Sequence, residues 1–154
     1  MIYVECNTDR ILIYVLTNKT PNEVEHCTGK GGVLEKLEYF GGSIGIIDKD
    51  HEAQQDSRIK NFNFIGSKFS LELYEDKDRN NKLIVLCPRL EDWILEIVKE
   101  ENINLNNFGF SENSNIFHKQ ANLNLTKFQT LLHKLIQRKN EKLIFLGDFI
   151  LGKN

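Results

Sequence analysis

The first 48 residues alternate between short apolar runs and helix-like segments, and this alternation constrains the fold more than any other feature. Residues 2–4 and 44–47 are apolar or β-branched runs of strand length, and 24–27 is a second, short strand candidate. The stretches 11–16 and 33–40 between them carry apolar residues at helical spacing. Because such alternation favours right-handed crossovers between parallel strands, it predicts an α/β fold with a mainly parallel, Rossmann-like sheet flanked by helices.

The segments that join these elements are polar or rich in glycine. Residues 28–32, Thr-Gly-Lys-Gly-Gly, are expected to form a flexible loop before the second helix. A polar loop or short helix is expected over 51–63. Alternating residues around 69–73 and 83–87 then flank a polar run, a pattern that favours a hairpin or two adjacent strands.

The second half of the chain is predicted to be largely helical. Residues 90–98 form an amphipathic helix, 102–115 an Asn-rich loop, and 125–136 a final strong helix. The apolar tail, 143–150, fits either a strand or a helix. No repeat or boundary is visible, so residues 1–154 are expected to be a single domain, with an α/β core over 1–100 and a C-terminal helical extension over 101–154.

Charge and cysteine content exclude several classes. The net charge is -2, from 20 basic and 22 acidic residues, so binding of nucleic acid by bulk charge is excluded. Cys6, Cys27 and Cys87 form no CxxC pair, which argues against a disulfide framework or a zinc site. No signal peptide and no membrane-spanning run of about 20 apolar residues is visible. A cytoplasmic location without membrane contact is expected.

Acidic residues directly follow two of the predicted strands. Glu5 follows the first strand, and Asp48 and Asp50 follow the third. Open α/β sheets place ligands at the carboxyl ends of their strands, and alternate side chains of an extended chain point the same way. Carboxylates gathered at one place favour a hard cation between them. The sequence therefore predicts a site for Mg²⁺ (or Mn²⁺), with Glu5 as a third ligand or a general base.

This arrangement resembles the Toprim domain, which occurs in bacterial primases, topoisomerases, RecR-type repair proteins, small RNA maturases and OLD-family nucleases. The resemblance covers roughly the first half of the chain. The segment Gly29-Lys30-Gly31-Gly32 and the later Leu90-Glu91-Asp92 are also similar to small stand-alone Toprim proteins.

The resemblance implies roles for individual residues. Glu5 would be the catalytic glutamate or a metal ligand, Asp48 and Asp50 the metal-binding pair, and Asp9 a support for the first motif. One departure is that Cys6 stands where the family usually has glycine after the glutamate.

Three weaker candidates have alternative interpretations. Glu91 is a further candidate metal ligand, but Asp9 and Glu91 would also suit helix starts through the helix dipole. Lys30 is a candidate nucleic-acid contact, although a lysine in a glycine-rich segment is often only solvated.

Two functions of different classes follow. The leading hypothesis is a metal-dependent nuclease that hydrolyses phosphodiester bonds in DNA or RNA. The alternative is a non-catalytic Toprim unit that binds nucleic acid, nucleotide or a partner protein, for instance beside an ATPase in a phage-defence or DNA-repair assembly; this rests on analogy with the family. The oligomeric state is left open by both.

Overall fold

A computed structural model describes residues 1–49 and 56–153 of the chain. Residues 50–55 and 154 lie outside the described part. The predicted metal ligand Asp50 is therefore outside the described residues.

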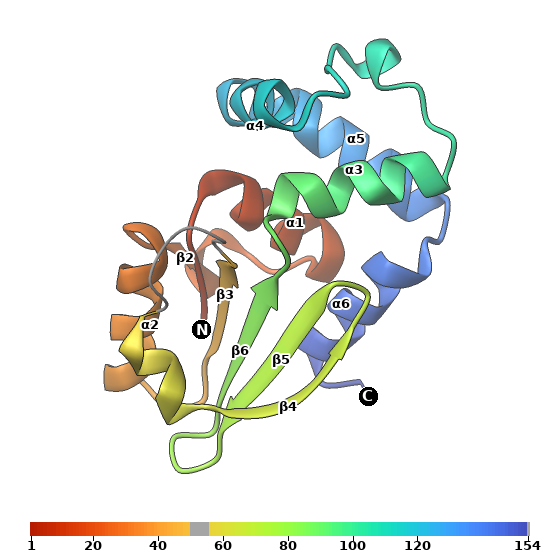
Figure 1. The fold of residues 1–154 in the computed structure, drawn as a ribbon. Helices are drawn as coiled ribbons and strands as arrows, with labels where there is room; N and C mark the ends of the chain where they lie inside the picture. Colours follow the sequence, from red (N-terminus) through yellow and green to blue (C-terminus); the bar gives the residue numbers. More distant parts are fainter. Residues whose placement is uncertain (50–55, 154) are drawn as a thin grey trace.

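The described strands form one six-stranded sheet in the order β2-β1-β3-β6-β5-β4 (Figure 1). The first four strands in this order run parallel, while β5 and β4 extend the sheet as antiparallel strands. The α/β class, the mainly parallel sheet and the predicted hairpin are thus confirmed. The strands are β1 (Ile2–Val4), β2 (Val24–His26), β3 (Ile44–Asp48), β4 (Asn63–Lys68), β5 (Leu71–Asp76) and β6 (Asn81–Leu86).

Helices cover the two faces of the sheet unequally. Helix α2 packs on one face, and α1, α3 and α6 lie on the other, with α4 and α5 packed farther out (Figure 1). The described helices are α1 (Asn7–Thr17), α2 (Gly29–Tyr39), α3 (Leu90–Glu100), α4 (Ser114–Leu123), α5 (Leu125–Gln137) and α6 (Glu141–Leu151). None of them is long and apolar enough to cross a membrane.

The alternation of side chains along the strands explains this two-sided core. In β1, Ile2 and Val4 face the larger cluster with α1 and α3, and Tyr3 faces the smaller cluster with α2. In β3, Ile46 faces the larger cluster and Ile47 the smaller one. Since successive side chains of a strand point to opposite faces, continuous apolar runs are what a sheet covered on both faces requires.

The prediction of a flexible loop over residues 28–32 is wrong, because Gly29–Gly32 form the first turn of α2. Gly29 has a φ of +65°, which turns the chain sharply from β2 into the helix. A Cβ on Gly32 would lie 3.2 Å from the Cβ of Cys27, so the helix start fits closely against the end of the strand. These glycines serve a tight strand–helix junction.

Other boundaries also differ from expectation. Helix α1 is capped by Cys6, where Asn7 or Thr8 was expected. The apolar tail is helical and forms α6, so the helix over 125–136 is not the last one. Strand β4 and helix α4 were not predicted.

Candidate active site at the carboxyl edge of the sheet

The structure brings Glu5 and Asp48 into direct contact. Asp48 ends β3, and Glu5 directly follows β1, its parallel neighbour. The backbone N–H of Asp48 donates a hydrogen bond of 2.6 Å to Oε2 of Glu5. The Asp48 side chain is held in turn, because Oδ1 accepts a 2.9 Å hydrogen bond from the N–H of Leu90 at the start of α3.

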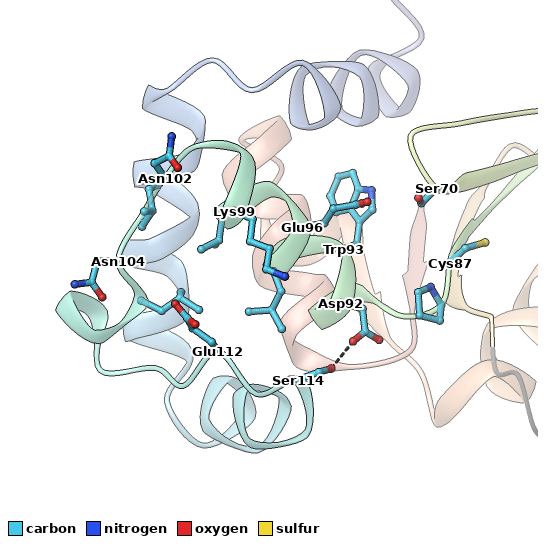
Figure 2. Close-up of a pocket in the computed structure, with 15 residues that line it drawn as sticks. Ser70, Cys87, Asp92, Trp93, Glu96, Lys99, Asn102, Asn104, Glu112 and Ser114 are labelled. Carbon is cyan, nitrogen blue, oxygen red and sulfur yellow. Dashed lines mark hydrogen bonds between the residues drawn. The ribbon is translucent and has the colours of Figure 1, made fainter.

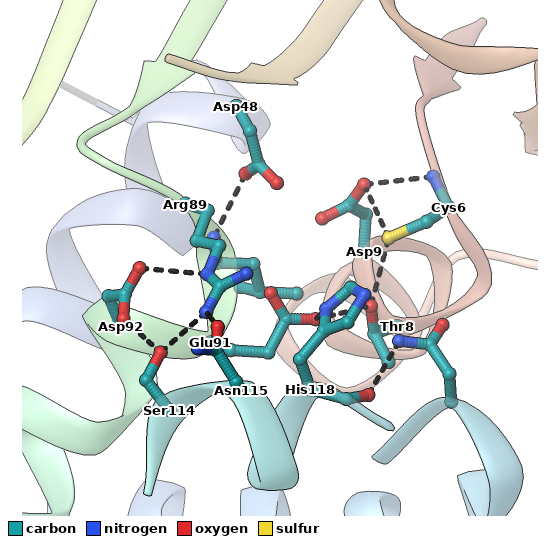
Figure 3. Close-up of polar contacts among 12 residues, drawn as sticks. Cys6, Thr8, Asp9, Asp48, Arg89, Glu91, Asp92, Ser114, Asn115 and His118 are labelled. Carbon is teal, nitrogen blue, oxygen red and sulfur yellow. Dashed lines mark hydrogen bonds and ion pairs between the residues drawn. The ribbon is translucent and has the colours of Figure 1, made fainter. Parts of the chain in front are cut away.

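Asp9 lies in the first turn of α1 and is buried. Its Oδ2 accepts hydrogen bonds from the backbone N–H of Cys6 at 3.0 Å and from the thiol of Cys6 at 3.1 Å (Figure 3). Its Oδ1 is also buried and has no hydrogen-bond partner among the described residues. A buried oxygen without a partner is costly, so this atom needs a further ligand or a proton.

Glu91 is the fourth acid and is 1% exposed. The hydroxyl of Thr8 donates to its Oε1 at 3.4 Å. Nδ1 of His118, from α4, lies 3.0 Å from the same oxygen but without the angular geometry of a hydrogen bond. Glu91 thus links α1, α3 and α4 at one point.

Burial and neighbouring carboxylates raise the pKa values of two of these acids, Asp48 and Asp9. Burial, followed by the charges of Asp9 and Glu5, raises the pKa of Asp48 to about 9. Burial also raises the pKa of Asp9 to about 7, with a smaller contribution from the charges of Glu5 and Glu91. In the absence of a cation, Asp48 therefore keeps its proton near neutral pH, and Asp9 is partly protonated there.

The thiol of Cys6 is unsuited to nucleophilic catalysis. Burial, and then the charge of Asp9, raises its pKa above the ordinary thiol value. Because the thiolate is the reactive form, the neutral thiol acts here as a hydrogen-bond donor to Asp9. Cys6, Cys27 and Cys87 are all free thiols.

Within residues 1–49 and 56–153, no group of three or more acidic, histidine or cysteine side chains has an arrangement that could hold a metal ion. One oxygen of Glu5 and one of Asp48 are engaged by backbone N–H groups. Magnesium commonly uses only one or two carboxylates and keeps several waters, so two acids of this cluster suffice for such an ion. The orphaned Oδ1 of Asp9 is an oxygen ligand of the required kind.

Lys30 lies in the first turn of α2. Its charge acts on Asp56, whose pKa is lowered to about 2, chiefly by hydrogen bonds from Arg58. The structure thus associates Lys30 with the segment that precedes β4.

Arg89 and His118 were not singled out from the sequence as site residues. Arg89 caps α3, and its Nε donates to Asp92 at 3.0 Å. Its Nη2 donates to Ser114 Oγ at 2.7 Å and to Asn115 Oδ1 at 2.9 Å (Figure 3). The only available sequence signal was an arginine directly before the Leu-Glu-Asp segment.

A cavity of about 920 Å³ lies along α3 but is not lined by Glu5, Asp9 or Asp48. Figure 2 shows its wall, to which α3 contributes both acidic and basic side chains, among them Glu96 and Lys99. The cavity borders the Asp92–Ser114 contact and is separate from the four acids. Its mixed charge does not indicate one class of ligand.

Comparison with known proteins gives no relative: no family model, no curated protein and no solved structure matches this chain.

Proposed function

We propose that the carboxyl edge of the sheet binds Mg²⁺ (or Mn²⁺) and hydrolyses phosphodiester bonds in DNA or RNA, as the resemblance to Toprim domains implies. The observation that carries the proposal is the buried Oδ1 of Asp9, which has no partner within residues 1–49 and 56–153 and lies in a cluster with three further carboxylates. Such a cluster is destabilised by mutual repulsion until a cation or protons neutralise it.

The residues fit a hard cation such as magnesium, which needs only one or two carboxylate ligands from the protein. Asp48 and Asp9 offer carboxylate oxygens within the described chain, and Asp50 is the further ligand predicted from the Asp-x-Asp pattern. A bound magnesium ion supplies positive charge against the scissile phosphate and the charge that develops on it.

The protein's own groups would orient the reaction. Glu5 is held toward β3 by the N–H of Asp48, and its role is to accept the proton of the attacking water or to complete the ligand set. Asp48 is fixed by the N–H of Leu90, so its remaining oxygen has a defined direction. Fixed carboxylates need little rearrangement when a substrate binds.

The test uses labelled single- and double-stranded DNA and RNA, incubated with magnesium or manganese. Asp48→Asn and Glu5→Gln are expected to abolish cleavage, as is a chelator. Asp78→Asn is the matched control, because Asp78 lies in the β5–β6 turn at the opposite edge of the sheet. The proposal is contradicted if Asp48→Asn and Glu5→Gln both still cleave, or if a chelator does not reduce cleavage by the wild type.

A second candidate is binding of nucleic acid, nucleotide or a partner protein without hydrolysis. The observation that favours it is Cys6, whose N–H and thiol both engage Oδ2 of Asp9 at the place where the Toprim pattern has glycine. Calorimetry that shows binding of magnesium or of an oligonucleotide, together with no turnover of any nucleic acid, favours this candidate over hydrolysis.

A further inference from the structure

Helix α4 reaches the acidic site although it lies in the chain segment beyond the Toprim resemblance. It contacts the site at two points: Ser114 and Asn115 bind Arg89, and His118 lies against Glu91. The first contact involves a cation at the edge of a site proposed to bind phosphate.

The guanidinium of Arg89 is fixed on two of its three nitrogens. Nε donates to Asp92, and Nη2 donates to Ser114 and Asn115. A guanidinium has five N–H donors, so the two on Nη1 remain. Within the described part of the chain, Nη1 makes no hydrogen bond or ion pair, and the side chain is 30% exposed.

The position of Arg89 relates it to the acids. It directly precedes Leu90, whose N–H binds Asp48. In Figure 3 the guanidinium lies between Asp92 on one side and the group of Asp48, Glu91 and Asp9 on the other. In this view the terminal nitrogen that carries no dashed line, Nη1, lies on the side of the guanidinium away from Asp92 (Figure 3).

The charge balance of the site calls for such a cation. Four carboxylates surround the site, and one magnesium ion carries only two positive charges. A phosphodiester adds another negative charge. Arginine suits this task because Nη1 can donate to a phosphate oxygen while the other two nitrogens stay bound, and because its charge persists at any working pH.

We propose that Arg89 is the phosphate-binding residue of the acidic site and that Ser114 and Asn115 position its guanidinium through α4. The ligand is the phosphodiester backbone of a nucleic-acid strand. This inference rests on the proposed function. The competing explanation is that Arg89 only ties α4 to α3.

The test measures binding of a short fluorescein-labelled strand, DNA and RNA in turn, to the full chain in magnesium by anisotropy, together with cleavage of the same strand. Arg89→Lys keeps the charge but loses the planar group that holds Asp92, Ser114 and the phosphate at once, and it is expected to weaken binding by about 10- to 100-fold, as for loss of a charge-assisted hydrogen bond. Arg79→Lys, at the opposite edge of the sheet, is the matched control and is expected to bind as the wild type does.

Ser114 gives an independent test if Arg89→Lys folds poorly. Ser114→Ala is expected to weaken binding with little change in thermal stability, and Ser114→Thr, which keeps the hydroxyl, to restore it. A structural tether alone predicts a lower melting temperature with unchanged binding by the folded protein.

The outcomes separate the two proposals. If Arg89→Lys and Ser114→Ala bind and cleave the strand within about twofold of the wild type, the role of Arg89 is overturned and the proposed hydrolysis is not. Binding that depends on Arg89, without cleavage by the wild type, supports this role and overturns hydrolysis. Absence of any strand binding by the wild type overturns both.

Discussion

The backbone N–H of Asp48 donates a 2.6 Å hydrogen bond to Oε2 of Glu5, across 43 residues of sequence. This bond fastens the chain that leaves β1 to the end of β3. It makes Glu5 a structural residue as well as a candidate functional one, and these two roles can be separated by substitution.

Glu5→Ala removes the acceptor of this bond and leaves the N–H of Asp48 without its partner. Loss of such a bond costs about 1 to 3 kcal/mol, so we expect a lower free energy of unfolding in urea. Glu5→Gln keeps an acceptor and removes one charge from the cluster. We expect its metal-free stability to equal or exceed that of the wild type, whereas its magnesium affinity falls. Equal stabilities of the two variants would contradict this role of the hydrogen bond.

The raised pKa values of Asp48, about 9, and Asp9, about 7, make the stability of the metal-free protein depend on pH. Above about pH 5 an unfolded aspartate has lost its proton, whereas the folded state keeps protons up to these higher values. The folded state thus binds more protons than the unfolded state, and the free energy of unfolding falls as pH rises. We expect the melting temperature in chelator to decrease from about pH 5 to about pH 9.

Two comparisons check this assignment. Asp48→Asn should flatten the pH dependence, and Asp78→Asn should leave it as in the wild type. Added magnesium should raise the melting temperature more at high pH, where the acids are ionised, than at low pH. A melting temperature that rises with pH in chelator would refute the assignment.

Gly45 in β3 is required by packing against α2. A Cβ there would lie 2.5 Å from Cδ1 of Leu37 and 3.0 Å from Cγ1 of Val33. We expect Gly45→Ala to destabilise the protein by about 1 to 3 kcal/mol, as overpacking does. In Gly31→Ala, the matched control in α2, the new Cβ meets only the flexible guanidinium of Arg58, at 3.4 Å. That change should be neutral or stabilise by up to about 1 kcal/mol in thermal unfolding.

Asn81 joins three segments at the amino edge of the sheet. Its buried amide accepts from the N–H of Ser43 and donates to the carbonyls of Leu37 and Phe40. Asn81→Ala leaves three backbone groups without partners and is expected to cost about 2 to 4 kcal/mol in urea unfolding. The control, Asn122→Ala, removes one exposed bond and should change stability by less than about 0.5 kcal/mol.

The sequence predicted the elements whose apolar pattern is local. Strands β1 and β3 have short apolar runs because both faces of the sheet are covered there. Strand β4 escaped prediction because it lies at the edge of the sheet with Phe64 and Ile65 exposed, and its register shifts between Phe64 and Gly66. Helix α4 gave a weak helical signal because it buries only Phe117 and Ala121.

The candidate site was likewise predictable from the sequence only in part. Glu5 and Asp48 could be placed together because each follows a strand and the strands are parallel neighbours. Arg89 and His118 could not be associated with the acids, because the position of α4 depends on tertiary packing. Phe117 of α4 lies against Phe110 and Phe128, which are contacts between segments that no local pattern joins.

The interior position of β1, between β2 and β3, has a consequence for how the molecule opens. Its amides are paired within a buried strand, so hydrogen exchange there requires the cooperative opening of the whole sheet. The edge strand β4 can fray and exchange by itself. Glu5 and Asp48 emerge from the most protected part of the backbone, so their carboxylates are presented by a framework that is rigid before any ligand arrives.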